Sequence, residues 1–122
     1  MEGYLLILNR IKLGEDLKAP IYSRESHDVI DNALSIEPHH KIIITEGNYL
    51  FYDAEGWREI KDIIDLKIYI EAEKGACEKR LLERHMHGGK TEAEALEKIK
   101  EVDMKNFDLI AQTMKYADKV IK

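Results

Sequence analysis

The chain has 122 residues, of which 44% are hydrophobic and 35% are charged, so its composition is that of one globular domain rather than of a disordered segment. The formal net charge of −5 disfavours broad binding to nucleic acid or to an anionic membrane surface. No apolar run reaches membrane-spanning length, and the single cysteine, Cys77, excludes an intrachain disulfide and fits a reducing, cytoplasmic environment.

The first third of the chain contains one clear helical pattern. Apolar side chains recur at helical spacing over residues 1–12, and Gly14 follows as a suitable stop, so we predict an amphipathic helix there. Residues 15–40 show little periodicity and are longer than most connections within a compact domain. We therefore predict an irregular, partly packed functional loop, with a short strand within Val29–Ile36.

The stretch Lys41–Tyr52, KIIITEGNYLFY, is the centre of the predicted fold. Its three consecutive isoleucines predict a strand that is buried on both faces, as in a parallel sheet covered by helices. Glu46 follows at the carboxyl end of this strand, where ligands bind in open sheets, and Gly47 permits a sharp turn or a close approach. Glu46 is therefore a candidate to hold a water, a Mg²⁺ ion or a substrate hydroxyl. The alternative is that Glu46 is merely the first exposed residue after a strand.

The remaining elements alternate between helix and strand. We predict a helix over Glu55–Ile64, a strand over Leu66–Ile70, a helix over Ala76–His87, a helix from the capping box Thr91–Glu94 to about Met114, and a closing strand over Ala117–Ile121. This order of elements predicts an α/β fold with a parallel sheet. We assign residues 1–122 to a single domain.

Two polar residues interrupt an apolar face of the last helix. The positions that share this face are Leu96, Ile99, Asp103, Asn106, Ile110 and Met114. Because a polar pair within an apolar stripe must be hydrogen-bonded or line a cleft, Asp103 and Asn106 are candidate site residues. The alternative is that Val102 and Phe107 carry the packing, which would turn the polar pair toward solvent.

Two arginines lie one helical turn apart in the preceding helix. Arg80 and Arg84 precede Gly88-Gly89, so two guanidinium groups beside a mobile glycine hinge could clamp a polyphosphate. The alternative is a solvated, salt-bridged helix face formed by Glu78 and Glu83 with these arginines and the flanking bases, which are Lys79, His85, His87 and Lys90.

Other patterns argue against common sites. His85 and His87 lie two residues apart and do not share a helix face, so we do not predict that they bind a metal together. Cys77 has no partner that would make it a nucleophile, and we expect it to be packed. The 122 residues contain no G-x-x-x-x-G-K-[ST] loop, because Gly88–Thr91 supplies only the last letters and follows a helix.

Taken in order, these residues resemble the second half of the uridine kinase-like P-loop kinases, a group that includes phosphoribulokinase and pantothenate kinase. The matching stretches are Ala19–Ser23 with His27-Asp28, then Ile42–Tyr49, Arg80–Arg84 with the glycines after them, Asp103–Asn106, and Tyr116–Ile121. The strand, P-loop, helix and second strand with the catalytic aspartate, which open the family's fold, are not among these residues.

The resemblance implies a partial parallel, three-layer P-loop-kinase-like sheet flanked by helices, with a lid over about residues 76–106. It implies transfer of the γ-phosphoryl group of ATP to a hydroxyl of a nucleoside, sugar or related small molecule, with Mg²⁺. By the same resemblance, Glu46 lies near the metal and the substrate, and Arg80 and Arg84 bind ATP and stabilise the transferring phosphate. The substrate side would be lined by Tyr22, His27, Asp103 and Asn106.

Without a P-loop we expect negligible kinase activity from this chain alone. One alternative is a binding or oligomerising module derived from such a kinase, completed by a second copy or by a segment that supplies the missing half. Another is a metal-dependent hydrolase that uses Glu46, Asp53 and Asp103. The partners that we expect are a small-molecule hydroxyl compound and a homo-oligomer or complementing segment, without nucleic acid or membrane.

Overall fold

The computed structural model of the protein describes residues 2–23 and 28–122, which divide into two compact units. Unit 1 comprises the described residues within 1–50 and 54–64, and unit 2 comprises residues 51–53 and 65–122. No helix in the described part of the chain is long and apolar enough to cross a membrane.

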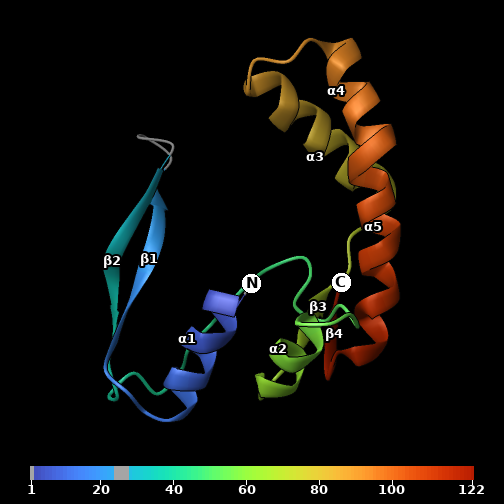
Figure 1. Cartoon of the computed structure of the whole chain (residues 1–122). Helices are drawn as coiled ribbons and strands as arrows, with labels where there is room; N and C mark the ends of the chain where they lie inside the picture. Colours follow the sequence, from blue (N-terminus) through green and yellow to red (C-terminus); the bar gives the residue numbers. More distant parts are fainter. Residues whose placement is uncertain (1, 24–27) are drawn as a thin grey trace. The chain divides into compact units, whose positions relative to one another are not determined.

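Unit 1 consists of helix α1 (Glu2–Lys12), an antiparallel hairpin of β1 (Leu17–Ser23) and β2 (Asp28–Ile36), and helix α2 (Trp57–Ile63) (Figure 1). The helices predicted over residues 1–12 and 55–64 are therefore confirmed. Helix α1 contacts both α2 and β1. The core of this unit contains the completely buried Ile60 together with the buried side chains Leu8, Leu17, Ala19 and Leu50.

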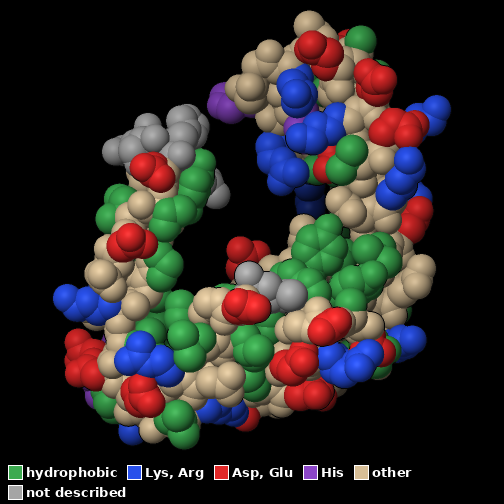
Figure 2. Space-filling view, viewed as in Figure 1, with side chains coloured by type: hydrophobic (Ala, Val, Ile, Leu, Met, Phe, Trp, Pro, Cys, Tyr) green, Lys and Arg blue, Asp and Glu red, His purple; other side chains and the backbone are tan. Residues whose placement is uncertain are grey.

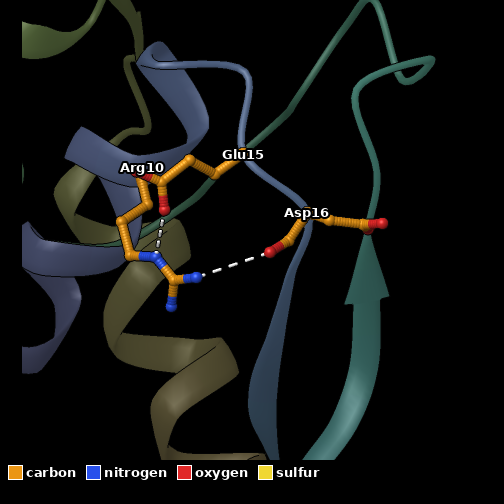
Figure 3. Close-up of polar contacts among 3 residues, drawn as sticks. All are labelled: Arg10, Glu15 and Asp16. Atoms are coloured by element: carbon orange, nitrogen blue, oxygen red, sulfur yellow. Dashed lines mark hydrogen bonds and ion pairs between the residues drawn. The ribbon is translucent and has the colours of Figure 1, made fainter.

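The end of α1 is fixed by a cluster of polar contacts. Gly14 has φ +69°, the left-handed conformation that commonly follows a helix. The Arg10 Nε group donates a 2.6 Å hydrogen bond to the Glu15 carboxylate, and Arg10 Nη2 lies 3.4 Å from the Asp16 carbonyl oxygen (Figure 3). The guanidinium of Arg10 thereby ties the last turn of α1 to the chain that leads into β1.

The prediction of an irregular segment over residues 15–40 is wrong for β1, whereas the strand predicted within Val29–Ile36 is confirmed by β2. The pairing shifts between Ala19 and Ile21, around Pro20. Proline has no backbone N–H to donate, and strands accommodate it at edges and bulges. In β2, Asn32 adopts a left-handed backbone conformation, with φ +54°, where the pairing shifts. This bulge breaks the alternating pattern by which a strand is recognised in a sequence.

The strand predicted over Lys41–Thr45 is wrong. Residues 41–47 belong to no strand, and the side chains of Ile42 and Ile44 are 81% and 90% exposed. Consecutive β-branched residues favour an extended backbone, but a strand forms only where a neighbour completes its hydrogen bonds. No strand among the described residues pairs with this stretch.

Unit 2 contains two strands, β3 (Ile68–Ile70) and β4 (Lys119–Ile121), which pair in parallel as predicted. Between them the chain forms α3 (Lys74–His87), α4 (Glu92–Lys98), the π-helical turn η1 (Ile99–Asp103), α5 (Met104–Ala111) and the 3₁₀ turn η2 (Gln112–Tyr116). The fold is thus mixed α/β with small sheets, and the larger parallel sheet that we predicted is confirmed only for this one pair of strands.

The last helix begins at Thr91 with the predicted capping box but is interrupted by η1. Its buried positions are Ala95, Ile99 and Met104, and Leu96 is half exposed. A π turn holds one residue more than an α-helical turn, so the buried face moves on by one position after Ile99. The apolar face predicted from uninterrupted helical spacing is therefore wrong at Leu96.

Candidate functional site

Helix α3 presents two unpaired guanidinium groups to solvent. Arg80 and Arg84 are both exposed, and neither forms a hydrogen bond or ion pair through its side chain with any residue that the structure describes. Lysine and arginine side chains gather around α3 in Figure 2. The predicted alternative, a solvated and salt-bridged helix face, agrees with the exposure of these arginines but is wrong for their ion pairs with Glu78 and Glu83. The two guanidinium groups are available for an anion.

The glycines after α3 form an ordered end to the helix. The Gly89 N–H donates to the Met86 carbonyl oxygen at 3.0 Å, and the Lys90 N–H donates to the His85 carbonyl oxygen at 3.1 Å. Gly89 has φ +93°, so these bonds form the Schellman arrangement that ends many helices. The two glycines thus end α3, and Thr91 caps the start of α4. Their role as a mobile hinge stays a prediction.

His85 and Asp103 form a contact that the sequence analysis missed. The His85 Nε2 atom lies 2.7 Å from Asp103 Oδ2, and the two side chains are only 10% and 17% exposed. The contact joins the last turn of α3 to the end of η1. The sequence signal for this contact is the helical spacing of His85 from Cys77 and Leu81, which indicates an inward-facing position.

The polar pair in the last helix is divided between two environments. Asp103 is hydrogen-bonded within unit 2, as a polar residue in an apolar stripe must be, and Val102 is exposed. The alternative that Val102 and Phe107 carry the packing is therefore wrong for Val102, whereas Phe107 is half-buried. Asn106 is half-buried on α5, and its side chain forms no hydrogen bond with the residues that the structure describes.

The candidates in unit 1 are exposed. Glu46 lies in an irregular segment, and its carboxylate has no hydrogen-bond or ion-pair partner among the described residues. Tyr22 is exposed on β1, opposite Val29 of β2, and His27 lies outside the described residues. A Cβ atom added at Gly47 would lie 3.3 Å from Leu50 Cγ, so the glycine allows a close approach of the Leu50 side chain.

The chemistry of these side chains fits the cofactors expected for a phosphotransferase. A single accessible carboxylate such as Glu46 suits Mg²⁺, which proteins hold through one or two carboxylates together with substrate phosphates. No group of three or more metal-ligating side chains gathers among the described residues. The structure places Arg80 and Arg84 on one helix and joins Asp103 to His85. Glu46 and Tyr22 belong to unit 1.

Comparison with known proteins was made on sequence and on structure. The pattern of the family described as Phosphoribulokinase / Uridine kinase family matches residues 4–122. A candidate uridine kinase of Schizosaccharomyces pombe is 30% identical over 109 residues, which cover 88% of this chain and 46% of that protein. A pantothenate kinase of Enterococcus faecalis is 36% identical over 86 residues, 69% of this chain and 28% of that protein. The chain thus spans less than half of the length of these relatives.

A solved structure also shows similarity to a candidate kinase, at the level of the fold. The crystal structure of a candidate fructose transport system kinase from Silicibacter sp. TM1040 is 29% identical in sequence and superposes with a TM-score of 0.87. The superposition covers 99% of this chain and 59% of that one. The fold of this chain is therefore similar to that of a large part of this solved protein.

Proposed function

Because the chain belongs to the phosphoribulokinase/uridine kinase family, we propose that it is the substrate-loop and lid portion of an ATP-dependent kinase. The proposed reaction is transfer of the γ-phosphoryl group of ATP to a hydroxyl of a nucleoside, a sugar or a related small molecule. The family match over residues 4–122 and the similarity to uridine and pantothenate kinases support this class of substrate.

The observation that carries the proposal is the unpaired arginine pair on α3. A guanidinium group binds phosphate through two parallel hydrogen bonds, and it remains charged at all physiological pH values. Arg80 and Arg84 lie one turn apart and have no carboxylate to neutralise them among the described residues. In the proposed reaction they bind the phosphates of ATP and stabilise the negative charge of the transferring group.

The other site residues are assigned by the same proposal. Glu46 holds Mg²⁺ or the substrate hydroxyl, and its accessible carboxylate supports that role. We assign Tyr22, Asp103 and Asn106 a role in binding the substrate, and His27, which lies outside the described residues, is assigned the same role by the family resemblance. Asp103 binds His85 through Oδ2, so in this proposal Oδ1 accepts a hydrogen bond from a substrate hydroxyl.

Binding of ATP by these 122 residues alone is expected to be weak. They contain no G-x-x-x-x-G-K-[ST] loop to surround the β-phosphate with backbone N–H groups. The proposal therefore assigns this phosphate cradle to a polypeptide segment outside these 122 residues. The arginine pair supplies only part of the ATP site.

A second candidate function is a module that associates with another polypeptide. The observation that favours it is the exposure of Ile42 and Ile44 in a stretch that no described strand pairs. Unpaired, β-branched backbone is a template for strand addition. Measurement of mass by sedimentation across a hundredfold range of concentration tests this candidate, because a constant monomer mass would exclude self-association.

Calorimetric titration with inorganic tripolyphosphate tests the kinase proposal, because this probe has the phosphates of ATP without its base. We expect the double variant Arg80→Ala with Arg84→Ala to bind it at least about tenfold more weakly than the unchanged chain, a difference of ~1.4 kcal/mol. The matched control is Lys105→Ala with Lys115→Ala, which removes two exposed positive charges elsewhere in unit 2. Equal binding by the unchanged chain and the arginine variant would contradict the proposal.

A further inference from the structure

Helix α3 is held to the rest of unit 2 by little apolar packing. None of its 14 residues is fully buried. Its inward side consists of half-buried side chains, among them Cys77, Leu81 and Leu82. The rotation of a helix about its own axis is normally fixed by an apolar stripe that is buried against its neighbours. In α3 that stripe is shallow, so a polar contact has more influence on the rotation.

The His85–Asp103 contact is shielded from water, because its two side chains are only 10% and 17% exposed. Exposed pairs in this unit, such as Lys105–Glu101 with side chains 68% and 53% exposed, are open to solvent. Water weakens such surface pairs, whereas a shielded hydrogen bond to a carboxylate is strong and directional. His85 is also tied through its backbone, because its carbonyl oxygen accepts the bond from Lys90. The side chain and the backbone of His85 therefore both hold the last turn of α3 in place.

The contact of His85 with Asp103 also fixes the directions in which the side chains of Arg80 and Arg84 point. Consecutive residues of an α-helix are about 100° apart around its axis, so the direction of the His85 side chain also determines the direction of the Arg84 side chain. Arg80 lies one turn before Arg84 and shares its face. With His85 directed at Asp103, both guanidinium groups point to solvent and have no partner among the described residues.

The π turn supplies the other half of this contact. Asp103 is the last residue of η1, and its neighbour Met104 is buried. The extra residue of the turn places Ile99 and Met104 in the packed face while Asp103 reaches α3. In an uninterrupted α-helix, positions 99 and 103 would share a face and Met104 would turn away from it.

We propose that His85 and Asp103 are positioning residues that set the rotation of α3 and thereby hold Arg80 and Arg84 in the orientation that binds polyphosphate. This inference rests on the proposed function, because it assumes that the arginines bind phosphate. It assigns a role in phosphate binding to two side chains that do not themselves contact the phosphate.

Four variants and one control test the inference by calorimetric titration with tripolyphosphate. His85→Ala removes the contact, and Asp103→Asn keeps its shape but removes the negative charge. His85→Gln retains an N–H donor at about the position of Nε2 and is the rescue variant. His87→Ala is the matched control, because this histidine lies two residues away, is exposed and has no partner among the described residues. The melting temperature of each variant is measured alongside.

We expect His85→Ala to weaken tripolyphosphate binding about fivefold or more, and Asp103→Asn to weaken it in the same direction. His85→Gln is expected to recover most of the binding, and His87→Ala to stay within about twofold of the unchanged chain. The variant lacking both partners, His85→Ala with Asp103→Ala, is expected to bind no more weakly than His85→Ala, since one contact cannot be lost twice.

The outcomes separate this inference from the proposed function. If the unchanged chain and the Arg80/Arg84 variant bind tripolyphosphate equally, the proposed function fails and the inference fails with it. If only the arginine variant loses binding and His85→Ala does not, the inference alone is overturned. It is also overturned if His85→Gln regains the melting temperature but not the binding, because the pair would then be only structural.

Discussion

Asp118 and Lys67 join the starts of the two parallel strands of unit 2. The Lys67 backbone N–H donates a 2.7 Å hydrogen bond to Asp118 Oδ2, and Lys67 Nζ lies 3.4 Å from the same oxygen. In return, the Asp118 N–H donates to the Lys67 carbonyl oxygen at 2.8 Å. A short parallel pair with three residues in each strand has few ladder bonds, so this contact contributes to its register.

The first prediction concerns the acid stability of this contact. The Lys67 backbone N–H lowers the pKa of Asp118 from its ordinary value of 3.8. A carboxyl whose pKa is lower in the folded state stabilises the fold above its unfolded pKa, and this stabilisation disappears as the pH falls through the folded value. Asp118→Asn is therefore expected to be less stable than the unchanged chain at pH 7, with the difference shrinking below about pH 4. Urea denaturation at pH 7, 4 and 3 measures it.

The control for this experiment is Glu101→Gln, which removes the carboxylate of an exposed pair. Exposed pairs contribute little, so its stability should follow that of the unchanged chain at every pH. A difference between Asp118→Asn and the unchanged chain that stays constant down to pH 3 would contradict the assignment.

The second prediction concerns the start of α4. The Thr91 Oγ1 atom accepts a bond from the Glu94 N–H, and the Glu94 carboxylate accepts bonds from the Thr91 hydroxyl and N–H. These bonds lower the pKa of Glu94, the Thr91 hydroxyl contributing most. Thr91→Ala is expected to destabilise the protein by about 1 kcal/mol and to return the Glu94 pKa toward 4.5. Denaturation and an NMR titration of Glu94 check the two effects.

Thr91→Ser is the matched control, because serine provides the same hydroxyl group and is an equally good capping residue. It should retain both the stability and the lowered Glu94 pKa. An unchanged Glu94 pKa in Thr91→Ala would show that the hydroxyl does not hold the carboxylate in solution.

The third prediction uses the left-handed cap of α3. Gly89 has φ +93°, which an L-residue with a Cβ atom adopts only at a cost. Gly89→Ala is expected to destabilise the protein by about 1 kcal/mol. Gly3→Ala is the control, because Gly3 lies in α1 with nothing within 4 Å of an added Cβ, and alanine favours helix. Its expected effect is opposite in sign, and thermal denaturation of both variants tests the pair.

The fourth prediction compares two isoleucines with opposite burial. Ile60 is completely buried in unit 1, whereas Ile44 is 90% exposed. Ile60→Ala is expected to cost about 3 kcal/mol through lost burial and the cavity left behind. Ile44→Ala should change the free energy of unfolding by less than about 0.5 kcal/mol. A large cost for Ile44→Ala in urea denaturation would mean that the isoleucine stretch is packed in solution.

Much of unit 2 could be predicted from the sequence because its signals are local. The capping residues Thr91 and Glu94 define the start of α4 by contacts three residues apart, and Gly88-Gly89 mark the end of α3. The parallel strands were recognised by apolar runs of suitable length between helices. The family resemblance, confirmed by the match over residues 4–122, likewise came from short stretches in a fixed order.

The site residues were predictable in part for the same reason. The arginine pair on α3 was visible as two positions one turn apart, but the sequence left open whether glutamates neutralise it. The absence of such partners among the described residues is a property of side-chain directions. The His85–Asp103 contact spans 18 residues and depends on the π turn, which the helical pattern of residues 91–114 did not reveal.

The sequence by itself determined which segments of this protein are helical, where its helices are capped and to which family it belongs, because these follow from contacts between residues a few positions apart and from the order of short motifs. Only the tertiary structure decided whether the Ile42–Ile44 stretch is a strand and whether Asp103 faces solvent or His85. Strand pairing and side-chain partners depend on residues distant along the chain, whose approach no local pattern specifies.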